Sequence, residues 1–86
     1  MIGLARTLAI ELGRFGVRVN CLLPGYIDTE IMSQIPKEKR RELRKTIPMK
    51  RFGKVDEVAA AAAWLVSDEN TYMTGQTLIL DGGLSA

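Results

Sequence analysis

The chain has 86 residues, enough for one small domain that buries about 60–65% of the surface its unfolded form exposes. Its apolar content of 47% is typical of a globular protein, and its net charge of +2 is too small to indicate a polyanionic partner. One cysteine excludes an internal disulfide, and the absence of histidine excludes a Ser-His-Asp triad or a histidine-bearing metal site within the chain.

The first predicted element is a helix over Met1–Arg14. Leu4, Leu8 and Leu12 recur every four residues and predict one apolar face. Gly16 suits the left-handed residue that follows a helix end. The helix has no capping residue at its start, because Met1-Ile2-Gly3 contains no Ser, Thr, Asp or Asn.

The segment Val17–Thr29 predicts a buried strand that begins at Val17, and a turn at Pro24-Gly25. A nearly continuous apolar run is typical of a parallel strand covered on both faces, and open α/β sheets bind ligands beyond the carboxyl ends of such strands. The candidate binding residues are therefore Pro24, Gly25, Ile27 and Thr29. The alternative is a simple strand-ending turn in which Thr29 or Asp28 caps a helix. Cys21, inside the strand, is interpreted as a small buried hydrophobe.

Residues 30–52 predict a charged lid. Pro36 suits the first position of a helix over Lys37–Thr46, in which Glu38 can reach Arg41 and Glu42 can reach Lys45. Residues 37–45 hold six basic and two acidic side chains, either as a solvated helix face or as a guide for an anionic substrate tail. Since no aromatic residue is interleaved with these charges, no nucleic-acid binding is expected.

A second long helix is predicted over Asp56–Val66, with Val58, Ala62, Leu65 and Val66 on one stripe. A last strand follows over Thr77–Asp81, and Gly82-Gly83 is interpreted as a tight turn at the sheet edge. The order helix, strand, lid, helix, strand predicts an α/β fold with a right-handed parallel pair. Two parallel strands leave faces and edges uncovered, so their partners are expected outside the chain.

Four segments resemble the short-chain dehydrogenase/reductase family in the same order, namely Arg18–Thr29, Arg51-Phe52-Gly53, Thr74-Gly75 and Leu80–Gly83. The resemblance is greatest to 3-oxoacyl-acyl-carrier-protein reductases and similar 3-hydroxy/3-oxo dehydrogenases. It implies that residues 1–86 are the C-terminal part of a single domain with a Rossmann-like doubly wound parallel sheet. Residues 30–52 would be the substrate lid, and the N-terminal dinucleotide-binding half would be absent.

The resemblance also implies an NAD(P)-dependent oxidoreductase that interconverts a carbonyl and a secondary alcohol on a small-molecule or acyl-thioester substrate. Pro24, Gly25, Ile27 and Thr29 would bind the cofactor, with the Ile27 backbone and the Thr29 hydroxyl at the nicotinamide carboxamide. The cofactor is NAD or NADP, with NADP favoured, and the complete protein is expected to be a cytoplasmic homo-oligomer. Nothing in the sequence resembles a signal peptide or a membrane span.

No catalytic or metal-binding residue is assigned within the chain. The family's Tyr-x-x-x-Lys motif does not occur, because Glu30 follows Tyr26 and Gln76 follows Tyr72 at that spacing. The chain alone is therefore expected to be inactive. The alternative function is a non-catalytic assembly or oligomerisation module that uses the alanine-rich helix 59–63 and Trp64. Finding Tyr-x-x-x-Lys upstream of Met1 would favour the enzyme.

Overall fold

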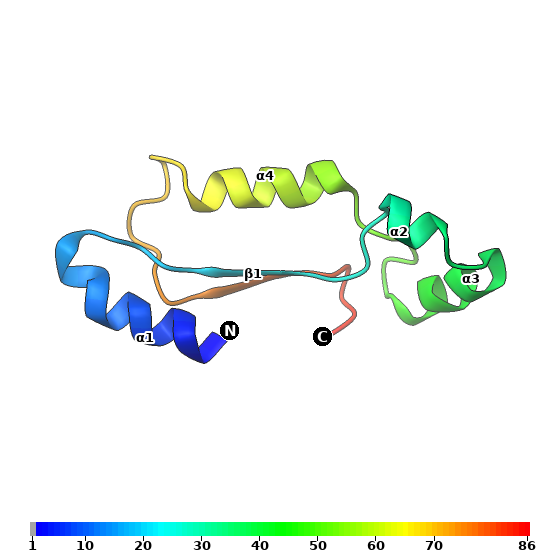
Figure 1. Ribbon diagram of the computed structural model, residues 1–86, viewed down its shortest axis with the longest axis horizontal. Helices are drawn as coiled ribbons and strands as arrows, with labels where there is room; N and C mark the ends of the chain where they lie inside the picture. The colour runs from blue at the N-terminus through cyan, green and yellow to red at the C-terminus, as the bar shows by residue number, and fades with distance from the viewer. Residues whose placement is uncertain (1) are drawn as a thin grey trace.

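The computed structural model describes residues 2–86 as four α-helices around a two-stranded sheet (Figure 1). In chain order the elements are α1 (Ile2–Leu12), a 3-10 turn (Gly13–Phe15), β1 (Cys21–Pro24), α2 (Glu30–Ser33), α3 (Lys37–Thr46), α4 (Val55–Leu65) and β2 (Thr77–Leu80). None of the helices described over residues 2–86 is both long and apolar enough to cross a membrane.

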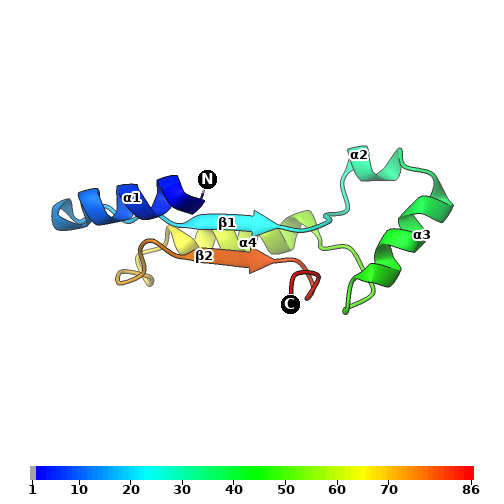
Figure 2. The ribbon, with the colours of Figure 1, turned by 90° about the horizontal axis from the view of Figure 1, so that it is seen from below.

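The sheet is parallel, as predicted. β1 pairs with β2 in the register Cys21↔Thr77 to Pro24↔Leu80. α4 lies over one face of the sheet and α1 lies on the opposite side, beside the start of β1 (Figures 1 and 2). α2 and α3 extend beyond the carboxyl ends of the strands, which is the edge where the candidate binding loop begins (Figure 1).

β1 begins at Cys21 and not at Val17, so the predicted strand was too long. The reason is that Arg18 and Asn20 bind the connection between α4 and β2. The Arg18 guanidinium donates to the carbonyls of Leu65 (2.8 Å) and Met73 (3.1 Å), and Asn20 Nδ2 donates to the same Met73 carbonyl (3.0 Å). These two polar side chains therefore align the strands before the sheet starts.

Several helix ends also differ from the sequence predictions. α1 ends at Leu12 and continues as a 3-10 turn to Phe15, after which Gly16 adopts the expected left-handed conformation (φ +75°). α4 runs from Val55 to Leu65, so Val66 lies outside the helix and is 80% exposed. Its assignment to the apolar stripe was wrong.

The lid helix α3 has the predicted bounds, but its expected ion pairs are absent. Pro36 occupies the cap position before the helix and not the first helical position. Among residues 2–86, the ion pair that forms joins Arg51 to Glu57, and neither Glu38 nor Glu42 pairs with a basic residue of α3. The basic side chains of α3 therefore have no acidic partner within the described chain.

The apolar core is very small. Its buried members are Ala9, Cys21, Ile47 and Leu65, and the most buried is Ile47 of the lid, at 2% exposure. The radius of gyration is 15.6 Å, whereas a compact domain of this length has about 12 Å. The accessible surface is 6539 Å², whereas a compact protein of 9.5 kDa exposes about 5,000 Å². Both values show that the chain is more extended and exposes more surface than a compact domain of the same size.

Candidate functional site

The candidate site begins where β1 ends. The Gly25 amide donates to the Leu80 carbonyl (2.9 Å), which extends the strand pairing by one bond. A side chain at Gly25 would place its Cβ 2.7 Å from Asp81 Cβ and 3.0 Å from Asp81 Cα. Only glycine permits so close an approach of the two backbones. The packing therefore requires glycine at position 25, independently of the role in binding that the sequence predicts for it.

Ile27 is held by a short backbone bridge to Gly53. Gly53 donates to the Tyr26 carbonyl (2.9 Å) and accepts from the Asp28 amide (2.8 Å), which makes Ile27 and Gly53 partners in a parallel bridge. In such a bridge the flanking residues form the bonds, and the central residue directs its own N–H and C=O to the opposite side. Within residues 2–86, neither backbone group of Ile27 has a hydrogen-bond partner. The loop therefore presents one fixed donor beside one fixed acceptor.

Thr29 caps the short helix α2, as the alternative interpretation predicted. Its Oγ1 accepts a hydrogen bond from the Met32 amide at 3.3 Å, and the side chain is exposed. Asp28 does not cap the helix, because the cap position is occupied by Thr29, and the Asp28 amide instead donates to Gly53 in the bridge. A hydroxyl that accepts one bond still has a proton to donate. The cap is thus compatible with a second bond from Thr29 to a ligand.

An aromatic pair connects this loop to the lid. Tyr26 and Phe52 pack edge to face with centroids 6.2 Å apart, and the guanidinium of Arg44 lies 5.6 Å from the centre of the Phe52 ring. Both are ordinary stabilising geometries for aromatic side chains. Through Phe52, the basic helix α3 is joined directly to the segment that contains Gly25 and Ile27.

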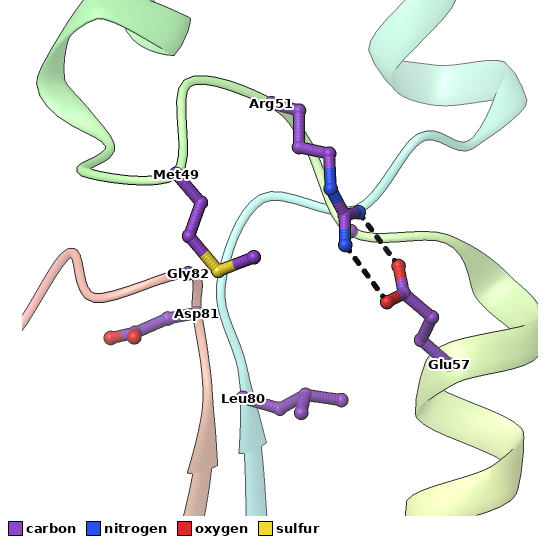
Figure 3. A pocket seen from close by; sticks show the side chains of 7 residues that line it. Met49, Arg51, Glu57, Leu80, Asp81 and Gly82 are labelled. Carbon is purple, nitrogen blue, oxygen red and sulfur yellow. Dashed lines mark hydrogen bonds and ion pairs between the residues drawn. The ribbon is translucent and has the colours of Figure 1, made fainter.

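A pocket of about 240 Å³ lies between the lid, α4 and the end of β2 (Figure 3). It is lined by Met49, Arg51, Gly53, Glu57, Leu80, Asp81 and Gly82. Arg51 forms a two-pronged ion pair with Glu57 at 2.8 and 3.0 Å. Two of the three charged side chains that line the pocket, Arg51 and Glu57, are therefore paired with each other at its wall, as Figure 3 shows.

The Glu57 carboxyl group has the most strongly shifted pKa of the site. The hydrogen bond from Arg51, followed by the hydrogen bond from the Lys54 amide (2.9 Å), lowers the pKa of Glu57 to about 2. The helical spacing alone did not predict this pair of Glu57 with Arg51. The available signal was a glutamate three residues after Lys54, the spacing at which a glutamate side chain accepts from the amide of the N-cap residue. The reciprocal bond does not form, because a lysine side chain cannot accept.

The Asp81 carboxylate accepts hydrogen bonds from backbone amides. It accepts from the amides of Gly83 and Ser85, both at 3.0 Å. Hydrogen bonding from Ser85 is the largest cause that lowers the pKa of Asp81. This carboxylate shapes the turn after β2.

Cys21 is buried and is not part of a disulfide, which confirms its interpretation as a small hydrophobe. Residues 2–86 contain no cluster of three or more metal-ligating side chains.

These features define part of a Rossmann-like α/β protein, with the candidate loop 24–29 at the carboxyl edge of its parallel strands. The family described as "Enoyl-(Acyl carrier protein) reductase" matches residues 1–85. The chain belongs to the short-chain dehydrogenase/reductase family.

Individual relatives agree with this assignment. The chain is 52% identical over 83 residues to Glucose 1-dehydrogenase 2 of Bacillus subtilis, covering 95% of this chain and 32% of the relative. A 3-oxoacyl-[acyl-carrier protein] reductase from Brucella melitensis superposes with a TM-score of 0.95 at 42% identity, covering 99% of this chain and 32% of that one. YwfH, described as an NADPH-dependent reductase involved in bacilysin biosynthesis, superposes with a TM-score of 0.90 at 37% identity over 96% of this chain and 35% of that one. The chain thus spans about a third of the length of each.

Proposed function

We propose that the native protein carrying this chain is an NAD(P)-dependent oxidoreductase that interconverts a carbonyl and a secondary alcohol. Residues 24–29 form the nicotinamide side of its cofactor site. The observation that supports this is the pair of unused backbone groups at Ile27, close in sequence to the Thr29 hydroxyl. A carboxamide has one carbonyl acceptor and one amide donor group, so it matches a fixed donor and a fixed acceptor.

Each residue of the loop has a defined part in this proposal. Pro24 and Gly25 end the strand and bring the loop against Asp81, which fixes where the carboxamide would lie. Ile27 would bind the carboxamide through its backbone, and Thr29 would donate its hydroxyl proton to the same end of the cofactor. The cofactor supplies the hydride, and the chain positions it. The residues that move the proton lie outside residues 1–86 in this proposal.

The preferred substrate is an acyl thioester with an anionic tail, and the preferred cofactor is NADP. Two observations support this substrate. The basic side chains of α3 have no acidic partner within residues 2–86 and attract negative charge, and one of them, Arg44, packs on Phe52 beside the candidate loop. The description of YwfH as NADPH-dependent supports the cofactor. The complete protein is further proposed to be a cytoplasmic homo-oligomer.

The test uses the native protein with NADPH or NADH, and compares 3-oxoacyl thioesters with simple ketones and sugars. We expect NAD(P)H to be consumed, fastest with the thioesters, and calorimetry to detect cofactor binding. The alternative, a non-catalytic assembly module, predicts a folded native protein that binds neither cofactor. Absence of both binding and turnover would refute the enzyme proposal.

A further inference from the structure

The turn after β2 contacts both functional segments of the chain. On one side Asp81 lies against Gly25, where a Cβ would come within 2.7 Å. On the other side Gly82 accepts a hydrogen bond from the Met49 amide at 3.1 Å, which ties the turn to the last part of the 30–52 lid. Figure 3 shows the Met49 side chain beside Gly82 at the rim of the pocket.

The lid enters this contact with its most buried residue. Ile47 is 2% exposed although α3, directly before it, is almost entirely polar. A Cβ on Gly82 would lie 2.9 Å from Ile47 Cγ2, and a Cβ on Gly83 would lie 3.0 Å from Pro48 Cγ. The bare Cα atoms of the two glycines are therefore the surface on which residues 47 and 48 pack.

The backbone of the turn also requires glycine. Gly82 and Gly83 have φ values of +65° and +94°, a region that residues with a side chain rarely occupy. The Asp81 carboxylate holds this conformation by accepting the Gly83 amide. Two independent requirements, conformation and space, coincide where the lid returns to the sheet.

We infer that Gly82 and Gly83 are positioning residues that hold the lid closed against the end of the sheet, so that residues 47–49 frame the substrate beside the loop 24–29. This inference rests on the proposed function for the identity of the lid's ligand. The sequence analysis interpreted the two glycines as a tight turn only, because nothing in the local sequence relates them to residues 47–49.

The test is the native protein with Gly82→Ala, compared with Gly16→Ala as a matched control. Gly16 has a similar φ of +75° but has no atom within 4 Å of its Cβ position, so it reproduces the backbone strain without the contact. In Gly82→Ala we expect hydrogen exchange of the Ile47, Met49 and Lys50 amides to accelerate about two- to tenfold, the range for loss of one hydrogen bond. In Gly16→Ala it should not change.

Kinetics provide the second measurement. Loss of a closed lid should raise KM for the substrate and leave kcat near its original value, because a binding contact is lost and the chemical step is untouched. A merely destabilising variant would lower the active fraction at constant KM. Equal lid exchange in Gly82→Ala and Gly16→Ala would overturn the inference, even in an active enzyme. If the protein has no oxidoreductase activity, the exchange experiment still decides whether the turn holds the lid.

A gentler variant covers the case in which Gly82→Ala does not fold. Pro48→Ala removes the ring that packs on Gly83 and leaves the turn intact. It should also accelerate exchange of the Ile47, Met49 and Lys50 amides while the exchange of β1 stays unchanged. Unchanged exchange in this variant, with Gly82→Ala unfolded, would equally overturn the inference.

Discussion

At the scale of single residues, Thr29 is the position where a structural and a functional role meet. Its hydroxyl accepts a long bond of 3.3 Å from Met32 at the start of an exposed four-residue helix. We expect Thr29→Val in the native protein to weaken cofactor binding between a few-fold and about a hundredfold, through the loss of one hydrogen bond and an unpaired partner.

Two further variants separate the roles of Thr29. Thr29→Ser keeps the hydroxyl and should retain the cofactor affinity. Thr29→Asp keeps an oxygen for the cap but cannot donate a proton, so it should stabilise α2 and still bind cofactor poorly. Calorimetric titration of NADPH beside a denaturant melt measures both effects. Unchanged affinity in Thr29→Val, with lower stability, would leave Thr29 as a helix cap alone.

Glu57 provides a prediction about pH. Its pKa is about 2 in the folded chain and near 4.5 ordinarily, so its ion pair with Arg51 stabilises the folded state fully above about pH 4.5. That contribution decreases progressively as the pH falls from about 4.5 to about 2. The difference in melting temperature between the native protein and Glu57→Gln should therefore be largest near pH 7 and disappear toward pH 2. Because both side chains are more than 40% exposed, the effect should be modest and should decrease with salt.

The control for Glu57 is Glu38→Gln, which removes an exposed carboxylate that forms no ion pair in the described part of the chain. The difference in melting temperature between the native protein and Glu38→Gln should be near zero from pH 7 to pH 2. A Glu57→Gln difference that persists undiminished at pH 2 would contradict the assignment of the lowered pKa to the ion pair.

At the scale of elements, the helix periodicities predicted α3 and much of α4, because each is decided by local spacing and local caps. The start of β1 could not be predicted, since it depends on bonds from Arg18 and Asn20 to residues more than 45 positions away. The burial of Ile47 was missed for the same reason. It packs against a turn 35 residues later, and the helix directly before it is almost entirely polar.

The residue types predicted where the candidate loop lies in the sequence, but they did not predict its backbone geometry. Pro24-Gly25 marks a strand end in any sequence, whereas the bridge that frees the backbone of Ile27 requires Gly53 from another segment. A side chain at residue 53 would come within 2.8 Å of Ile27 Cδ1. Long-range requirements of this kind have no local signature.

The charge of α3 makes a separate prediction for the lid. At helical spacing Lys37, Arg41 and Lys45 lie near one another, while Lys39 lies on the opposite face. Neutralising the first three to Gln should raise KM for a thioester with an anionic tail by up to about tenfold at low salt, and should leave neutral ketones unaffected. Lys39→Gln is the control. Equal effects on charged and neutral substrates would show that α3 is only a solvated face.

At the scale of the whole molecule, residues 1–86 expressed alone should have no dehydrogenase activity. The chain has no Tyr-x-x-x-Lys pair and no glycine-rich phosphate loop, so both proton transfer and cofactor binding lack essential groups. Purified chain incubated with NAD(P)H and 3-oxoacyl thioesters should show only the background rate. Turnover above that rate would mean that the proton donor lies within these residues.

The isolated chain should also self-associate. Its surface exceeds that of a compact protein of equal mass by about 1,500 Å², and large apolar side chains including Ile10, Phe15 and Ile79 are more than half exposed. Residues 2–86 contain four buried apolar residues and two strands, and both edges of their sheet are open. This core does little to offset the entropy of ordering the chain. Association with further copies would cover this surface. Light scattering should therefore give a mass that rises with concentration, and thermal melts should be broad. A monomer of constant mass with a sharp cooperative transition would show that this small core is sufficient.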